Sequence, residues 1–330
     1  MPKDEFEWIR QHTPERYNHS GVIEGIGDDA AVYAAEDGFD EILCVDTMVE
    51  EVHFKKQTMS PYDTGHKALA VNISDIAAMA GIPVYYIVSI AVPPSWTDEE
   101  LQELYNGMGA LAAEYDMDMI GGDTVSSQSG LVISVTVHGR VEKGRHLLRR
   151  NALPGDIVFV TNPTGRSAAG LDWLLQHGRG QNCPEPFQTL TAYHQRPRPR
   201  VEEGRIIAGT APTASLNDIS DGLASEANEI AEASGVKLQL RQQDIPAATE
   251  LKEAAGGDSY WDWIFYGGED FELIGTAREK NWSLLQQNMK EEGFPLYAIG
   301  RVQEGPPLVT LLDGTEEQTL PKKGYNHFQS

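Results

Sequence analysis

Short acidic clusters flanked by glycine, or set within an alanine-rich helix, recur along the chain. Six are found, at residues 27–29, 46–47, 72–75, 121–124, 217–222 and 267–270. Ordinary surface acids lie on exposed helix faces, whereas these follow apolar strands or lie in a helix with little polar surface. One such cluster is typical turn or cap chemistry. Six together indicate carboxylates placed at the ends of strands and helices of an α/β fold.

Hydrophobic periodicity and breaker residues divide the chain into strands and helices. Predicted strands are 41–45 (short, buried and ending at Asp46), 84–92, 131–141, 157–160, 296–302 and 308–312. Predicted helices are 66–80, 224–233 and one that begins after Thr97. Thr97 is expected to be an N-cap because three acids follow it in the first turn. The stretch 178–200 holds Gly, Gln, Pro and Arg, and this composition predicts that it contains a surface loop.

The length and a break near residues 140–155 predict two domains. A chain of 330 residues is long enough for two cores. We expect an α/β (α+β) fold with domains 1–142 and 143–330, the second beginning a new α/β unit at the 157–160 strand.

The charge balance limits the partners. The formal net charge is −24, from 50 acids and 26 bases, so nucleic acid and anionic membrane surfaces would be repelled. The first ten residues, MPKDEFEWIR, are charged and lack the apolar run of a signal peptide. No apolar run is long enough to span a bilayer. Cys44 and Cys183 form neither a metal spacing nor a disulfide framework. These features predict a cytoplasmic protein.

The acidic clusters predict a magnesium site. Mg²⁺ prefers carboxylate, water and phosphate oxygens, and it would relieve the repulsion between crowded carboxylates. Phosphoryl transfer needs such neutralisation because negative charge spreads over the transition state. Glycine beside the acids lets the backbone approach phosphates closely.

Other nucleotide-binding patterns are absent or weak. The chain has no G-x-x-x-x-G-K-[ST] loop and no protein-kinase signature. Residues 25–30 fit G-x-G-x-x-A, but no clear apolar strand precedes them and two acids would face the pyrophosphate. G-x-S-x-G and H-E-x-x-H are also absent.

With these residues the chain resembles the thiamine-monophosphate kinase family, in the superfamily that includes aminoimidazole ribonucleotide synthetase. The matching segments occur in family order and span nearly the whole chain. They are GIGDDAAV (25–32), DTMVEEVHF (46–54), KALAVNISDIAAMA (67–80), IGGDT (120–124), DISDGL (218–223), GGEDFEL (267–273) and KKGYNHF (322–328). Each motif alone is weak, whereas the ordered set is specific.

The resemblance implies a two-domain α/β fold, a homodimer formed through N-terminal strands, and ATP at a metal-rich cleft. It also implies ATP-dependent phosphorylation of thiamine monophosphate to thiamine diphosphate, with several Mg²⁺ ions. The implied Mg²⁺ ligands are Asp29, Asp46, Asp75, Asp123, Asp218 and Asp221. The implied ATP contacts are Tyr105, Gly122, Arg149 and Ser220. The implied thiamine phosphate contacts are His53, Glu269 and Tyr325.

One position departs from the family pattern. Relatives often carry Ser or Thr just before Asp46, whereas this chain has Cys44-Val45, so a hydroxyl ligand is lost there although a backbone carbonyl could still serve. Several residues also have plainer interpretations: His53 as a satisfied strand residue, Arg149 as a surface base, and Tyr325 as a pin for the C-terminal tail.

The expected mechanism is in-line transfer of the γ-phosphoryl group to a phosphate oxygen of thiamine monophosphate. That phosphate is largely dianionic near neutral pH, since its second pKa is about 6, so no general base is predicted. Three alternatives stay open: a sibling ATP enzyme such as aminoimidazole ribonucleotide synthetase or selenophosphate synthetase, a non-catalytic metal-binding module, and a structural protein.

Overall fold

The computed structural model describes residues 16–24, 32–33, 35–180, 183–255 and 259–323. The chain divides into two compact units. Unit 1 comprises Met1–Ile76 and Ile82–Gly144, and unit 2 comprises Ala77–Gly81 and Arg145–Ser330. The division therefore falls after Gly144, and the five residues Ala77–Gly81, at and just after the end of a helix, group with unit 2.

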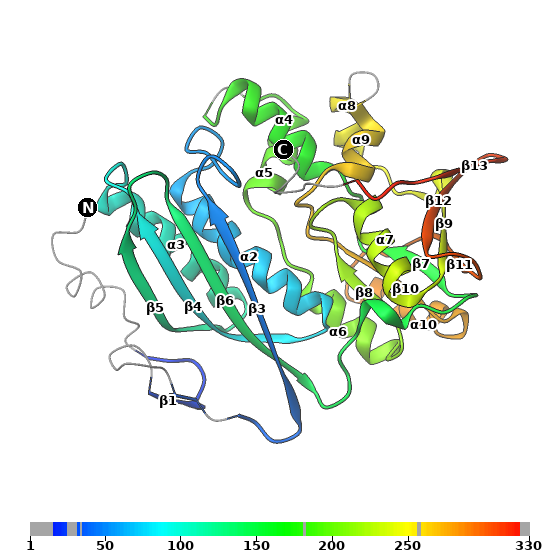
Figure 1. The fold of residues 1–330 in the computed structure, drawn as a ribbon, viewed down its shortest axis with the longest axis horizontal. Coiled ribbons are helices and arrows are strands. Elements are labelled where there is room, and N and C mark those ends of the chain that lie inside the picture. Colours follow the sequence, from blue (N-terminus) through cyan, green and yellow to red (C-terminus); the bar gives the residue numbers. More distant parts are fainter. Residues whose placement is uncertain (1–15, 25–31, 34, 181–182, 256–258, 324–330) are drawn as a thin grey trace. The chain divides into compact units, whose positions relative to one another are not determined.

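Unit 1 is built on a four-stranded sheet (Figure 1). Its elements are β1 (Val22–Glu24), β2 (Val32–Tyr33), β3 (Phe39–Val49), α2 (Pro61–Ala78), β4 (Ile82–Val92), α3 (Asp98–Glu114), β5 (Asp118–Ser126) and β6 (Val132–Glu142). The strand order is β3-β6-β4-β5, with β4 and β5 parallel and the other pairs antiparallel. Helix α3 makes the crossover that two parallel neighbours require.

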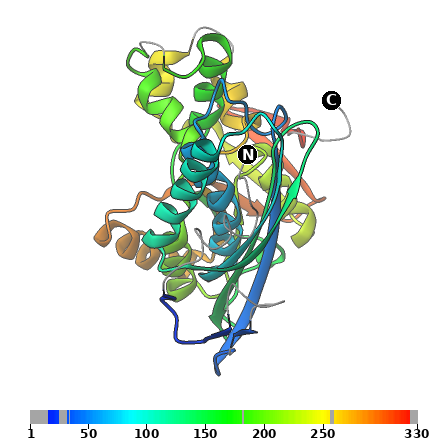
Figure 2. The same cartoon turned by 90° about the vertical axis from the view of Figure 1, so that its left-hand side faces the viewer.

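Helices α2 and α3 lie on one face of this sheet (Figure 2). Thr97 caps α3 through a capping box with Glu100, as predicted from the sequence. The two helices approach closely where Gly65 and Gly107 lie. A Cβ on Gly65 would stand 1.8 Å from the Leu104 carbonyl oxygen, and one on Gly107 2.0 Å from the Tyr62 carbonyl oxygen. Glycine is therefore required at this crossing.

Strand β3 differs from the prediction of a short buried strand ending at Asp46. It continues through Asp46 to Val49, and its outward side chains are exposed, with Leu43 at 72% and Val45 at 60%. The apolar run therefore does not mark burial on both faces. Only the alternate side chains that face the helices are covered.

Unit 2 holds a seven-stranded sheet in the described part of the chain, in the order β13-β12-β9-β11-β7-β10-β8. The strands are β7 (Ile157–Val160), β8 (Ser215–Asp218), β9 (Lys237–Arg241), β10 (Leu273–Ala277), β11 (Tyr297–Gln303), β12 (Leu308–Asp313) and β13 (Glu316–Thr319). The helices are η1 (Arg149–Asn151), α4 (Arg166–His177), α5 (Phe187–Gln195), α6 (Val201–Thr210), α7 (Leu223–Ser234), η2 (Gln242–Asp244), α8 (Thr249–Ala254), α9 (Ser259–Tyr266) and α10 (Glu279–Glu291).

The segment 178–200 is not simply the surface loop that its composition predicted. It contains α5, whose Leu190 and His194 are buried, and it ends on the buried Arg200. Leu190 belongs to the main core cluster of unit 2 together with Val160, Ile219 and Ile274. The Pro and Arg residues that suggested a loop lie in the segments before and after α5.

Candidate active site

Asp46 and Asp75 both lie near Cys44 within unit 1. The Asp46 amide donates a 2.9 Å hydrogen bond to Oδ1 of Asn72, which lies one turn before Asp75 on α2. The Cys44 thiol donates to the Asn72 carbonyl oxygen at 3.3 Å. Burial raises the pKa of the Cys44 thiol, and the charges of Asp75 and Asp46 raise it further. Two carboxylates therefore flank the residue that departs from the family pattern.

His53 lies in the turn after β3, beside Asp46. Its Nδ1 accepts a 3.1 Å hydrogen bond from the Val49 amide, which fixes the ring. Burial raises the pKa of Asp46, while the charge of His53 lowers it. The local hydrogen bond agrees with the plainer interpretation of a satisfied histidine, and the nearness to Asp46 agrees with a role in the site.

The strand registers place Asp123 and Asp46 on opposite faces of the unit 1 sheet. Asp123 pairs with Ser89, Ser89 pairs with Ser134, and the Ser134 hydroxyl accepts from Thr47 at 2.9 Å. These side chains share the outer face of the sheet, whereas Asp46 follows the opposite parity and pairs with the buried Val135. Within unit 1, Asp46 and Asp123 therefore lie on opposite faces of the sheet.

The two predicted ATP contacts of unit 1 are Gly122 and Tyr105. A Cβ on Gly122 would stand 2.3 Å from the Val88 carbonyl oxygen, so glycine is needed for the β4–β5 pairing whatever it binds. Tyr105 lies on α3, and burial raises the pKa of its hydroxyl to about 12.

In unit 2 the DISDG motif joins β8 to α7 and places Asp218 and Asp221 near Glu226. The Glu226 carboxylate accepts from the Asp221 amide at 3.3 Å and the Ser220 hydroxyl at 3.5 Å. Burial and then the charges of Asp218 and Asp221 raise the pKa of Glu226 to about 8. Sequence analysis missed Glu226, whose only signal is a carboxylate in the first turn of the helix that follows the motif.

Arg149 lies beside the same motif. It belongs to η1, and its Nε donates a 2.8 Å hydrogen bond to Oδ1 of Asn217, the residue before Asp218. Its Nη1 lies 3.4 Å from Glu229 of α7. The Arg149 side chain is 49% exposed, which agrees with the plainer interpretation of a surface base, although its guanidinium contacts both β8 and α7.

The GGEDFEL motif pairs with DISDG through the backbone. The Glu269 amide donates to the Ser220 carbonyl oxygen at 2.7 Å, and the Phe271 amide donates to the Ile219 carbonyl oxygen at 2.9 Å. Glu269 and Phe271 have positive φ values of 66° and 51°. Such values are unfavourable for residues with a Cβ and persist only where the surroundings hold them.

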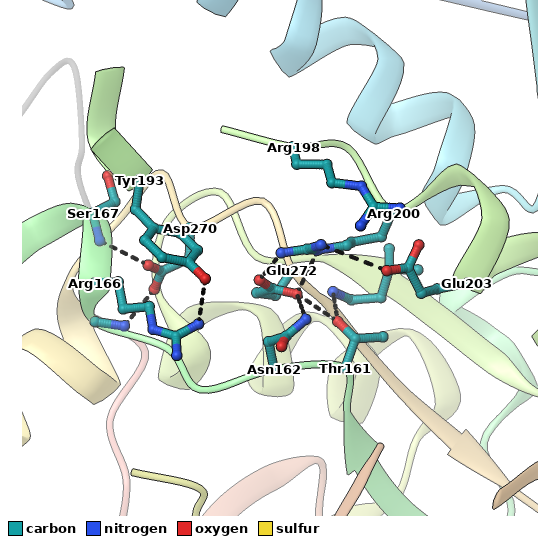
Figure 3. Close-up of polar contacts among 12 residues, drawn as sticks. Thr161, Asn162, Arg166, Ser167, Tyr193, Arg198, Arg200, Glu203, Asp270 and Glu272 are labelled. Atoms are coloured by element: carbon teal, nitrogen blue, oxygen red, sulfur yellow. Dashed lines mark hydrogen bonds and ion pairs between the residues drawn. The ribbon is translucent and has the colours of Figure 1, made fainter. Parts of the chain in front are cut away.

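Two buried acids of this motif, absent from the predicted site, hold the turn in place (Figure 3). Asp270 accepts from the amides of Gly165 at 2.6 Å and Ser167 at 3.0 Å, and burial raises its pKa to about 7. Glu272 accepts from the Arg200 guanidinium, the Thr161 hydroxyl and the Asn162 amide group. The sequence indicated that this motif is functional, but it did not indicate that Asp270 and Glu272 hold the turn in place.

Asp29 and Tyr325 lie outside the described residues, and within residues 16–24, 32–33, 35–180, 183–255 and 259–323 no group of three His, Cys, Asp or Glu side chains is close enough to hold a metal ion. The donor chemistry nevertheless fits Mg²⁺. In each unit one acidic group has a pKa raised by burial first and then by the charges of two aspartates: Cys44 beside Asp75 and Asp46, and Glu226 beside Asp218 and Asp221. A hard cation would neutralise those charges.

Comparison with known proteins identifies the family. Residues 27–141 match the N-terminal domain of the AIR synthase related proteins, and residues 154–312 match their C-terminal domain. Thiamine-monophosphate kinase of Bacillus subtilis (strain 168) is 49% identical over 327 residues, covering 99% of this chain and all of the relative.

Two solved structures extend the likeness to the fold. Thiamine-monophosphate kinase from Stenotrophomonas maltophilia K279a matches with a TM-score of 0.82 and 31% identity, over 92% of this chain and 94% of that one. AaThiL complexed with AMPPCP and TMP matches with a TM-score of 0.78 and 30% identity, over 89% of both chains. The chain belongs to the thiamine-monophosphate kinase family, within the AIR synthase related proteins.

Proposed function

We propose that this protein transfers the γ-phosphoryl group of ATP to thiamine monophosphate, forming thiamine diphosphate and ADP. The observation that carries the proposal is the full-length likeness to a thiamine-monophosphate kinase of 49% identity. The likeness to AaThiL in complex with AMPPCP and TMP supports the same pair of substrates.

Several Mg²⁺ ions complete the proposed site, held by Asp29, Asp46, Asp75, Asp123, Asp218 and Asp221. Bound magnesium would neutralise the phosphates and stabilise negative charge during transfer. The gathering of Asp46 and Asp75 around Cys44, and of Asp218 and Asp221 around Glu226, supports this assignment. A strongly acidic chain needs such cations to bind two anionic substrates.

The protein's own groups bind and orient the substrates. Proposed ATP contacts are Gly122, Tyr105, Arg149 and Ser220, and proposed thiamine phosphate contacts are His53, Glu269 and Tyr325. The Arg149 fork suits a phosphate, and the Glu269 carboxylate suits the cationic thiazolium. A phosphate oxygen is already ionised near neutral pH, so alignment of the nucleophile replaces general base catalysis.

The homodimer is also proposed, through the outer face of the unit 1 sheet. That face carries exposed apolar side chains: Leu43, Val45, Ile87 and Val125. Exposed apolar side chains gathered on one sheet face are typical of an interaction surface. Among the described residues no helix is long and apolar enough to cross a membrane, and we propose that the enzyme works in the cytoplasm.

A coupled ADP-release assay tests the reaction. Purified full-length protein is incubated with ATP and thiamine monophosphate, with Mg²⁺ or with excess EDTA, and the product is identified by mass. We expect thiamine diphosphate only when Mg²⁺ is present. ATP binding without any transfer to thiamine monophosphate would contradict the proposed acceptor, and full turnover in EDTA would contradict the metal assignment.

A further inference from the structure

The carboxylate of Glu269 lies against a buried histidine that the proposed reaction leaves unused. His194 is 1% exposed, and its Nδ1 lies 3.4 Å from Oε2 of Glu269 and 3.1 Å from the Ser167 hydroxyl. We propose that Ser167 and His194 are positioning residues that orient the Glu269 carboxylate toward the thiamine end of the acceptor. The inference rests on the proposed function.

The three side chains come from three separate elements of unit 2. His194 is in the last turn of α5, Ser167 is in the first turn of α4, and Glu269 follows α9. The Glu269 side chain is 30% exposed, so without a fixed partner its carboxylate could adopt several rotamers. A buried imidazole, fixed by a hydroxyl on a neighbouring helix, gives it one preferred orientation.

Ser167 holds the turn at two adjacent positions. Its backbone amide donates to Oδ1 of Asp270 at 3.0 Å, as Figure 3 shows. Its hydroxyl contacts His194, which in turn contacts Glu269. Ser167 therefore supports the unfavourable backbone of Glu269 through its bond to the neighbouring Asp270. It also supports the Glu269 side chain through His194.

This arrangement predicts which substrate depends on Ser167 and His194 for its binding. Glu269 is proposed to face the thiazolium cation, so a misoriented carboxylate would weaken thiamine monophosphate binding and leave ATP binding unchanged. A side chain that merely fills the core would instead affect stability, or both substrates alike. Positioning is therefore separable from a purely structural role.

The test compares variants of His194 and Ser167 in the full-length protein. His194→Leu keeps the volume and removes the polar contact, whereas His194→Asn keeps a polar group near the Nδ1 position. We expect His194→Leu and Ser167→Ala to raise the calorimetric Kd for thiamine monophosphate roughly tenfold, an effect of the size expected for losing one polar contact. The KM for ATP should change less than about twofold, and His194→Asn should recover most of the affinity.

Thr164→Val is the matched control, because Thr164 is a buried hydroxyl before α4 that bonds the Ile264 carbonyl oxygen and not Glu269. It should lower the melting temperature without changing the Kd for thiamine monophosphate. Unchanged affinity in His194→Leu, or equal losses for both substrates, would overturn the inference while wild-type turnover still supported the kinase. A wild type that neither bound nor phosphorylated thiamine monophosphate would overturn both.

Discussion

At the scale of single residues, Asp75 offers the sharpest test of the proposed metal site. We expect Asp75→Asn to lower kcat at least about 100-fold, because one neutral ligand removes charge that stabilises the transition state. The half-buried side chain should tolerate the isosteric change, so the melting temperature should stay near the wild-type value. Steady-state kinetics at saturating Mg²⁺, with calorimetry for stability, provides the measurement.

Asp116→Asn is the matched control for this prediction. Asp116 is exposed in the same unit and has a positive φ of 53°, a conformation that Asn adopts readily. It changes the net charge equally and should leave kcat unaltered. Near-normal turnover of both Asp75→Asn and Asp123→Asn would rule out a metal site built from these acids.

The raised pKa of Asp270 predicts that the free energy of unfolding depends on pH. Its pKa is raised to about 7 by burial, so between pH 4 and 7 the folded state binds a proton that the unfolded state releases. Stability from this group is therefore greatest below the unfolded-state pKa and falls as the pH rises toward 7, by at most about 1.4 kcal/mol per pH unit. Urea unfolding of wild type and Asp270→Asn across this range should give a difference that shrinks with rising pH. A constant difference would mean that Asp270 is ionised throughout.

At the scale of elements, the N-terminus of α3 predicts a local stability effect. The Thr97 hydroxyl accepts a hydrogen bond from the Glu100 amide, and the Glu100 carboxylate accepts one from the Thr97 amide. Thr97→Ala should cost about 1 kcal/mol of unfolding free energy, while Thr97→Ser should keep nearly all of it. Equal midpoints of Thr97→Ala and wild type in urea would show that Lys56, which also bonds Glu100, holds the helix end alone.

Elements with a strong local signal could be predicted from the sequence. The strand 157–160 and the capped start of α3 both match, because apolar runs and capping chemistry act over a few residues. The exposed face of β3 could not be predicted, because strand alternation does not say which face a neighbouring helix covers. Helix α5 was missed because Pro and Arg after it resemble a loop, although tertiary contacts bury Arg200 against Glu272.

The candidate site likewise contains some residues that the sequence could predict and others that it could not. Glycine-flanked aspartates mark its motifs, since few other uses require acids beside glycine at strand ends. Glu226 carries no such mark. Asp270 lies in the marked cluster at 267–270, but its supporting role depends on backbone amides that are distant in sequence. Asp270 reaches Gly165 and Ser167 more than 100 residues away.

At the scale of the whole molecule, the outer face of the unit 1 sheet predicts self-association. Leu43 and Val45 stand 72% and 60% exposed on adjacent outward positions of β3. If this face pairs two copies, the double change Leu43→Glu, Val45→Glu would bury unpaired carboxylates, which costs several kcal/mol. The dimer should then dissociate at least about 100-fold more readily.

Sedimentation equilibrium decides this prediction. Wild type should sediment at twice the 36.3 kDa mass of the chain, and the double variant as a monomer at micromolar concentration. Leu284→Glu is the control, because Leu284 is 53% exposed on α10 of unit 2 and the change places a carboxylate at an apolar surface position. If the double variant remained dimeric, another surface would have to join the copies. If it became monomeric and kept full activity, each chain would hold a complete site, and Asp123, which shares this outer face, would act without a partner.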